Sequence, residues 1–233
     1  MNDSNEVLYQ VEDGIATICL NRPQRRNALS ISLSNRLVDL WEEVDRDEQV
    51  RVVILTSTDC GTFCAGMDLK EAAELKKTRG LDVLSQLKDP MQRRVRRVTK
   101  PMIAAMTGHA PAGGMLLSLS CDLRVGLAGT TMAITEAKVG RGSPWAVPLL
   151  WQMPQPLLME LVLTGEPMSV ERLHAAGFVN YVEATPDAVR ARARTLAERI
   201  RDNAPLSVAA GKASIVAAMS LGCEAGLVNA DKL

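Results

Sequence analysis

Two neighbouring glycines, Gly113 and Gly114, lie where an apolar stretch gives way to a helix-like one. Residues 102–107 read as a buried strand, and residues 115–121 read as a helix. The first N–H groups of a helix have no partner within it and carry a partial positive charge. Because glycine has no side chain, a ligand can approach its backbone closely. The chemistry predicted for residues 108–122 is therefore the binding of a negatively charged oxygen by backbone N–H groups.

A second segment, residues 62–70, has the same organisation. It follows the apolar stretch 52–57, contains Gly66, and begins a helix for which Asp68 is a cap or a first-turn acid. Two N–H donors that converge on one oxygen are what a developing enolate or oxyanion requires. From the residues alone, ordinary glycine-containing turns of an α/β protein remain the alternative for both segments.

Four sequence motifs combine these segments with two others. The first joins Asn21-Arg22-Pro23 to Asn27-Ala28-Leu29-Ser30, and the second is Phe63-Cys64-Ala65-Gly66-Met67-Asp68-Leu69. The third runs from Lys100-Pro101 through Gly108 to Pro111-Ala112-Gly113-Gly114, and the fourth is Cys121-Asp122-Leu123-Arg124. In this order and spacing they resemble the crotonase (enoyl-CoA hydratase/isomerase) superfamily, from about Val7 to the end of the chain.

The resemblance implies a site for an acyl-CoA thioester, with coenzyme A as part of the substrate and no separate cofactor. The oxyanion donors would be the N–H groups of Met67 and Gly113, and Glu136 would be the catalytic carboxylate. In the family the loop that follows Asn21-Arg22-Pro23 lies near the CoA pyrophosphate, which suggests an anion contact for Arg25; a solvated arginine is the alternative. The other substrate contacts are expected from Ala65, Gly66, Met67, Asp68, Leu69, Lys70, Gly113, Gly114, Leu116 and Trp145.

Leu116 departs from the pattern of the two-acid hydratases in this family. They carry a glutamate three residues after the second oxyanion glycine, and this chain has Leu116 there. Positions three apart share a helix face, so Leu116 should point at the pocket, but it cannot move a proton. Addition of water uses two carboxylates, whereas moving a double bond from C3 to C2 needs one, which would be Glu136. The pattern therefore looks like the Δ3,Δ2-enoyl-CoA isomerase branch. An enoyl-CoA hydratase and a non-catalytic acyl-CoA-binding protein are the alternatives.

The composition excludes several other classes. Lys plus Arg and Asp plus Glu are balanced at 27 each, and aromatic residues are only 3%. Neither value favours a nucleic acid or a membrane surface as partner. The five scattered cysteines suggest reduced thiols in a cytoplasmic protein, and the one close pair, Cys60 and Cys64, lacks the second pair that a metal site would need. No apolar run reaches about 18 residues, so no membrane span is expected.

The fold class expected is α/β. Strands at 7–10 and 15–20 should form a hairpin around the turn Glu12-Asp13-Gly14, and helices are expected at 32–46, 156–163, 169–176, 186–201 and 205–219. The resemblance implies a spiral of ββα units over residues 1–150, which holds the site, and a helical region over 151–233. That region resembles the family's trimerisation region, so a homotrimer or a dimer of trimers is expected.

Three further expectations concern surface and structural residues. Residues 76–89 should be a mobile surface segment. The arginines of residues 90–98 should form a solvated helix face, with CoA phosphates or a neighbouring subunit as the alternative contacts. Asp122 should be structural and paired with Arg124.

Overall fold

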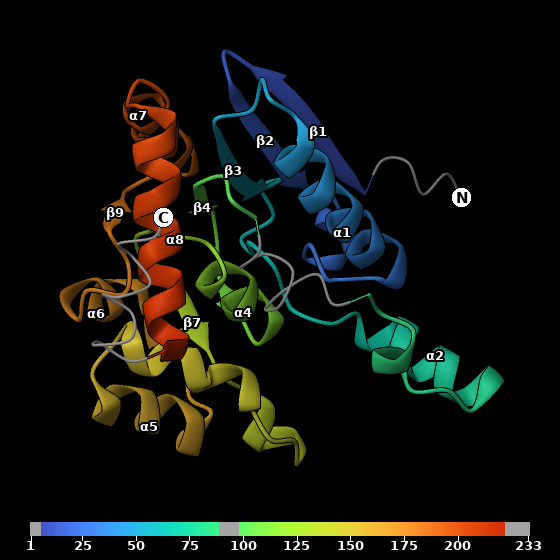
Figure 1. Cartoon of the computed structure of the whole chain (residues 1–233). Helices are drawn as coiled ribbons and strands as arrows, with labels where there is room; N and C mark the ends of the chain where they lie inside the picture. Colours follow the sequence, from blue (N-terminus) through green and yellow to red (C-terminus); the bar gives the residue numbers. More distant parts are fainter. Residues whose placement is uncertain (1–5, 89–97, 222–233) are drawn as a thin grey trace.

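The computed structural model describes residues 6–88 and 98–221. The arginine cluster of residues 90–97 lies outside the described residues. Within them, six strands form the larger sheet in the order β1-β2-β3-β4-β6-β9 (Figure 1). Their bounds are β1 (Val7–Glu12), β2 (Ile15–Leu20), β3 (Val52–Ser57), β4 (Met102–Met106), β6 (Leu123–Leu127) and β9 (Tyr181–Glu183).

The hairpin predicted at the start of the chain is confirmed. β1 and β2 are antiparallel, and Val7 lies opposite Leu20. The two turn residues, Asp13 and Gly14, have φ angles of 49° and 75°, which a two-residue hairpin turn with the twist of its strands requires. From β2 onward, each neighbouring pair of strands is parallel.

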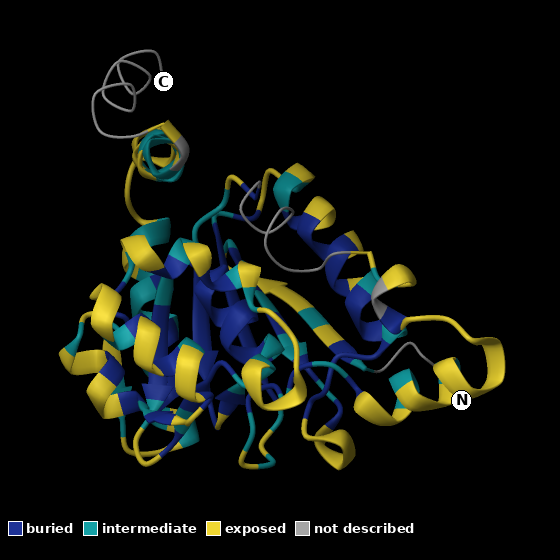
Figure 2. Cartoon of the chain, turned by 90° about the horizontal axis from the view of Figure 1, so that it is seen from below, coloured by how far each residue is buried: buried dark blue, intermediate teal, exposed yellow. Residues whose placement is uncertain are grey.

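Both faces of the larger sheet are covered, so its inner strands are apolar throughout. All six residues of β3 are buried. Val52 and Ile54 pack with side chains of helix α7 (Pro186–Arg201), whereas Val53 and Leu55 belong to the main core on the other face. Successive strand residues point to opposite faces of the sheet. A strand that is buried on both faces is therefore apolar throughout and does not alternate between apolar and polar residues. The buried residues gather at the centre of the molecule (Figure 2).

Helix α1 (Ile31–Arg46) packs on the main-core face. It begins after Ser30, whose side chain accepts a hydrogen bond from the Leu33 N–H and so caps the helix. The apolar residues predicted to be core are all buried: Leu33, Leu37, Leu40, Trp41 and Val44. Their helical spacing places them on one face of α1.

Three short strands make a second sheet in the order β5-β7-β8. They are β5 (Ala110–Pro111), β7 (Thr131–Ala133) and β8 (Met168–Ser169), and α4 (Gly113–Leu119) follows β5 directly. The remaining helices are α2 (Leu69–Arg79), α5 (Gln155–Thr164), α6 (Val170–Ala175) and α8 (Pro205–Leu221), with 3-10 turns at Pro23–Arg25, Val83–Ser85, Glu136–Val139 and Pro144–Trp151. This α/β architecture fits the expected crotonase fold. Strands β8 and β9 come from beyond residue 150; the domain division at that residue stays a prediction.

The structure adds helix to one predicted segment, whose mobility stays a prediction, and corrects one predicted ion pair. Residues 76–79 belong to α2, which ends at Gly80 with a φ of 65°. No residue of α2 is buried, so this helix has no apolar stripe that the sequence could show. Asp122 pairs with Lys212 at 2.7 Å, and the Arg124 guanidinium instead donates to backbone carbonyls such as that of Phe178, at 2.6 Å. Within the described ranges, no helix is both long and apolar enough to cross a membrane.

Candidate active site

The two glycine-containing segments predicted from the sequence lie in direct contact. A methyl group added at Gly66 would lie 2.9 Å from the Gly113 nitrogen, and one added at Gly113 would lie 2.9 Å from the Gly66 Cα. At Gly114 an added methyl would come within 2.1 Å of the Cys64 carbonyl oxygen. These positions need glycine because the two backbones touch there. The structure therefore brings the segments of Met67 and Gly113 together.

The Met67 N–H points away from Leu29, the residue with which Met67 forms a β-bridge. Residues 29 and 67 form a parallel β-bridge, in which the Leu29 N–H donates to the Gly66 carbonyl at 2.7 Å and the Asp68 N–H donates to the Leu29 carbonyl at 3.0 Å. In a trans peptide group the N–H and the C=O point in opposite directions. Since the Gly66 carbonyl faces Leu29, the Met67 N–H of the same peptide group faces the other way.

The Gly113 N–H is the first of helix α4. The turn before it is strained, because Ala112 has a φ of 48° and a ψ of −116°, a conformation that a residue with a side chain rarely adopts. The Ala112 N–H donates to the Ala133 carbonyl at 2.8 Å, and the Ala112 carbonyl accepts from Leu116 at 3.0 Å. These two bonds hold the strained residue, and with it the start of α4, in place.

Asp68 is the N-cap of α2, as predicted. Its carboxylate accepts hydrogen bonds from the N–H groups of Lys70 and Glu71 at 3.1 and 3.2 Å, and from the Arg22 guanidinium at 3.0 Å. Burial works to raise the pKa of Asp68, but the Glu71 N–H and Arg22 outweigh it, and the pKa lies below its usual value. Asp68 is buried, and its side chain is used in capping α2 and in the ion pair with Arg22.

Three of the predicted substrate contacts are exposed and lie near Asp68, the N-cap of α2. Leu69 is 73% exposed, and Lys70 and Arg25 are also exposed. The charge of Arg25 lies close enough to contribute to lowering the pKa of Asp68. Positive charge at the start of α2, facing solvent, suits contacts to an anionic group, while Ala65 and Met67 are half-buried behind it.

Glu136 begins the 3-10 turn that follows β7. Its Oε1 accepts a hydrogen bond from the Trp145 indole nitrogen at 2.9 Å. Its Oε2 is buried and has no hydrogen-bond partner among the described residues. Burial of an unpaired carboxylate oxygen lowers the stability of the folded protein. Such an atom indicates a functional group whose hydrogen-bond partner is a ligand. The predicted substrate contact of Trp145 stays a prediction; the structure shows that its indole nitrogen bonds to Glu136.

Strand pairing brings the segments of Glu136 and Gly113 to the same edge of the small sheet. β5 and β7 are parallel, with Pro111 opposite Ala133. Gly113 follows the end of β5 and Glu136 follows the end of β7, and the ends of parallel strands lie at one edge. Leu116 is buried on α4, with its N–H bonded to Ala112.

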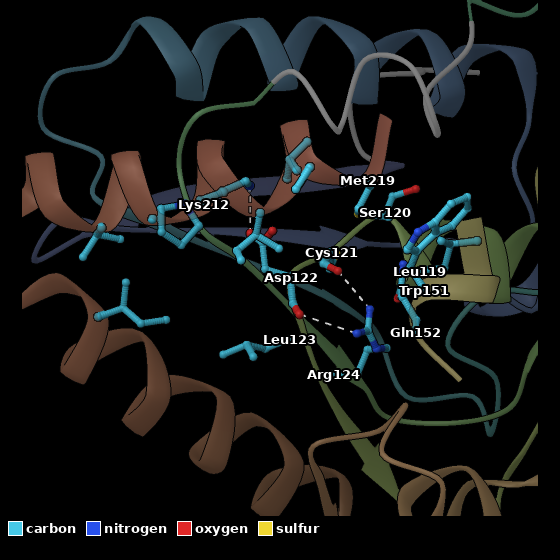
Figure 3. A pocket seen from close by; sticks show the side chains of 17 residues that line it. Leu119, Ser120, Cys121, Asp122, Leu123, Arg124, Trp151, Gln152, Lys212 and Met219 are labelled. Atoms are coloured by element: carbon cyan, nitrogen blue, oxygen red, sulfur yellow. Dashed lines mark hydrogen bonds and ion pairs between the residues drawn. The ribbon is translucent and has the colours of Figure 1, made fainter. Parts of the chain in front are cut away.

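A separate groove of about 800 Å³ lies between α8 and residues 119–124 (Figure 3). None of the predicted site residues lines it. Its charged groups are already satisfied: Lys212 pairs with Asp122, and Arg124 donates to the carbonyl of Cys121 at 2.9 Å. The predicted site at the contact between the two glycine segments is therefore separate from this groove.

Sequence reasoning missed the role of Arg22. This residue is 8% exposed, and its side chain contacts both Glu6 and Asp68. The signal for it was present, because Arg22 belongs to the first of the four motifs. Burial of Arg22 could not be read from the sequence, since arginine is usually exposed.

The fold and the contact between the two glycine segments are those of an enzyme of the crotonase type. A family model described as Enoyl-CoA hydratase/isomerase matches residues 10–232. The chain is 33% identical to (E)-benzylidenesuccinyl-CoA hydratase of Thauera aromatica, over 95% of this chain and 86% of that protein. It is 37% identical to an enoyl-CoA hydratase of Mycobacterium tuberculosis, over 83% of this chain and 73% of that protein.

Solved structures agree with the sequence comparisons. An enoyl-CoA hydratase from Mycobacterium tuberculosis H37Rv superposes with a TM-score of 0.85 at 34% identity, covering 98% of this chain and 88% of the other. One from Bacillus anthracis gives a TM-score of 0.88 at 28% identity, covering 97% and 88%. The chain belongs to the enoyl-CoA hydratase/isomerase family.

Proposed function

We propose that this enzyme moves a double bond within an enoyl-CoA thioester, from C3 to C2, with Glu136 as the only carboxylate that transfers the proton. The observation that supports it is the state of the Glu136 carboxylate: one oxygen accepts from Trp145, and the other is buried and unpaired. Where two-acid relatives carry a second glutamate, this chain has the buried Leu116. One base with one available oxygen suits a reaction in which the same group removes and returns a proton.

The proposed step begins with a 3-enoyl-CoA. Oε2 of Glu136 removes a proton from C2, and the electron pair of that C–H bond delocalises to the thioester oxygen. The negative charge on this oxygen is held by the N–H groups of Met67 and Gly113. Glu136 then gives the same proton to C4, the electrons return from the oxygen, and the double bond lies between C2 and C3. No group is gained or lost.

Replacement of Glu136 by Gln tests this proposal. Glu136→Gln keeps the shape of the side chain and its bond to Trp145 but removes the base. Conversion of 3-enoyl-CoA to its conjugated isomer, followed by the absorbance of the conjugated thioester, should fall by about a thousandfold, while acyl-CoA affinity measured by calorimetry stays within about threefold. Turnover at the wild-type rate would remove Glu136 as the base.

Hydration is the second candidate, because relatives of this chain carry the name enoyl-CoA hydratase. It would require Glu136 to activate the water and to protonate C2 as well. Loss of the absorbance of a conjugated 2-enoyl-CoA on incubation with the protein would reveal it. A protein that hydrates 2-enoyl-CoA faster than it isomerises 3-enoyl-CoA is a hydratase, and the single-carboxylate isomerase proposal would be abandoned.

The proposal includes a homotrimer or a dimer of trimers, with no cofactor other than the coenzyme A of the substrate. Helix α8 supports association, because it has one charged residue, Lys212, and exposes Leu206 at 84% and Ile215 at 70%. An apolar surface of this kind in water favours contact with another subunit. Light scattering would report the mass. The cytoplasmic location expected from the cysteines stays a prediction.

A further inference from the structure

Arg22 is a buried arginine between two carboxylates. Its Nε lies 2.6 Å from Glu6 Oε1, as an ion pair rather than an aligned hydrogen bond, and its Nη1 lies 3.0 Å from Asp68 Oδ2. The side chains of Arg22, Glu6 and Asp68 are 10%, 23% and 7% exposed. Charges this far from water are held rigidly, because leaving any one of them unpaired is costly.

The same nitrogen also binds the backbone. Arg22 Nη1 donates to the Ala28 carbonyl at 2.7 Å. The Ala28 carbonyl and the Leu29 N–H belong to one peptide group, and that N–H donates to the Gly66 carbonyl at 2.7 Å. The Gly66 carbonyl in turn shares its peptide group with the Met67 N–H. Two trans, planar peptide groups thus connect the guanidinium to the Met67 N–H in one line of hydrogen bonds.

Such a chain affects both the direction and the strength of its last donor. Each peptide plane is fixed at its carbonyl end, so the N–H at its other end cannot rotate freely. A cation at the start polarises every group along the chain, which strengthens the final N–H as a donor. The network also ties two helix caps together, because Glu6 Oε2 accepts from Ser30 Oγ at 2.7 Å and Asp68 caps α2.

We propose that Arg22 is a positioning residue for the reaction: its guanidinium orients and polarises the Met67 N–H through the peptide groups 28–29 and 66–67. This inference rests on the proposed function, in which that N–H holds the thioester oxygen. Arg22 is buried, so in this proposal it acts through the backbone and not by touching the substrate. Its effect should therefore fall on the step in which charge develops, and little on the binding of the acyl-CoA.

The experiment uses the full chain with Arg22→Lys and Arg22→Met, and Asp122→Asn as a matched control. A lysine keeps the positive charge but not the planar fork that holds Glu6, Asp68 and the Ala28 carbonyl together. Asp122, like Arg22, is ion-paired and hydrogen-bonded to the backbone, through Lys212 and the Met102 N–H, but it lies outside this chain of bonds. Loss of orientation at one donor should lower kcat on the order of 100-fold in Arg22→Met and about tenfold in Arg22→Lys.

Two measurements distinguish a positioning role of Arg22 from a purely structural role. KM for 3-enoyl-CoA should stay within about threefold, since binding of the ground state is little changed. The infrared carbonyl band of a bound, conjugated 2-enoyl-CoA should move towards its position in the free thioester, because the Met67 N–H polarises it less. Asp122→Asn should leave kcat and the band as in the wild type.

The outcomes distinguish this inference from the proposed function. A wild-type kcat or an unchanged carbonyl band in folded Arg22→Met would overturn it. If that variant does not fold, the same result in Arg22→Lys would overturn it equally. If the wild-type protein neither isomerises 3-enoyl-CoA nor shifts the carbonyl band, the proposed function fails and this inference with it. If the wild type does both and the Arg22 variants match it, only the positioning role fails.

Discussion

The Trp145 indole nitrogen donates to Glu136 Oε1 at 2.9 Å, and the other oxygen of the same carboxylate, Oε2, is buried without a partner in the described structure. The two oxygens of one side chain therefore have different surroundings, and the proposed function gives them different tasks. A hydrogen bond to the first fixes the plane of the carboxylate, which leaves the second oriented for proton transfer. A base held in one orientation loses little entropy when it reacts.

Replacement of Trp145 by Phe should separate orientation from basicity. The Trp145→Phe variant keeps an aromatic ring in the site and removes the donor to Glu136. We expect kcat to fall about 10-fold to 100-fold, because a freely rotating carboxylate is seldom correctly placed. KM for the acyl-CoA should change less than kcat. Steady-state kinetics with 3-enoyl-CoA would measure both.

Trp151→Phe provides the control for that experiment. Trp151 is 58% exposed and lies at the end of the same 3-10 segment, away from Glu136 in the chain. It should leave kcat near the wild-type value. Equal losses in both variants would mean that Trp145 acts through general packing and not through the carboxylate.

Installing the second acid should redirect the reaction. In Leu116→Glu a carboxyl group occupies the position that bears glutamate in two-acid hydratases. Hydration of 2-enoyl-CoA should rise about tenfold or more relative to isomerisation, because a second group can then share the proton transfers. The buried carboxyl group should cost stability on the order of 3 kcal/mol.

Leu116→Gln is the matched variant for Leu116→Glu. It introduces a polar side chain of the same length that cannot exchange a proton, so it should lower stability without raising hydration. The ratio of the two activities is measured from absorbance with each substrate. A ratio that does not differ between the two variants would show that residue 116 does not face the reacting carbons.

Much of the fold was predictable from periodicity and turn chemistry. The hairpin, α1 and α7 combine clear apolar patterns with residues suited to a turn or a cap, such as Ser30. Strands β5, β8 and β9 were not predicted, because each is only two or three residues long. A segment of that length shows no period, and pairing with distant strands decides its conformation.

The site was predictable only in part. The contact between the two glycine segments follows from the motifs, since those positions demand glycine; the roles of the two backbone amides and of Glu136 stay predictions. The supporting contacts did not follow, because Arg22 and Asp68 are 46 positions apart and their pairing is a tertiary fact. The bond between Trp145 and Glu136 likewise depends on how two irregular segments fold against each other, and irregular backbone has no sequence period.

The contact between Gly114 and Cys64 should make residue 114 intolerant of any side chain. In Gly114→Ala the new methyl group would lie 2.1 Å from the Cys64 carbonyl oxygen, closer than atoms can approach. The two segments must then separate, with a loss of unfolding free energy of about 2 kcal/mol. Activity should fall as well, because separation disturbs the neighbouring Gly113 N–H. Urea unfolding and kinetics measure the two effects.

Gly211→Ala is the matched control for Gly114→Ala. Gly211 is within α8, and a methyl group added there meets no atom within 4 Å. Alanine is favoured over glycine inside a helix by roughly 0.5 to 1 kcal/mol, so this variant should be more stable than the wild type. If both substitutions changed stability in the same direction, the close contact at Gly114 would not be the cause.

Acid should weaken the protein partly through Asp68. Burial works to raise the pKa of Asp68, but the Glu71 N–H and the Arg22 guanidinium outweigh it, and the pKa lies below its usual value of 3.8. A carboxylate with a lower pKa in the folded state than in the unfolded state stabilises the fold above the unfolded pKa. That contribution is lost as the pH falls through the folded pKa, because both states are then protonated.

We expect the difference in unfolding free energy between the wild type and Asp68→Asn to shrink as the pH falls. Asp68→Asn keeps an acceptor for the Lys70 and Glu71 N–H groups, since Asn is also a good N-cap, but it removes the titrating charge. The wild type should be more stable than Asp68→Asn near neutral pH, and the two should converge below about pH 4. Urea unfolding midpoints of both proteins across this range measure the difference. A gap that stays constant down to about pH 3 would show that the charge of Asp68, and hence its pairing with Arg22, contributes nothing to the fold.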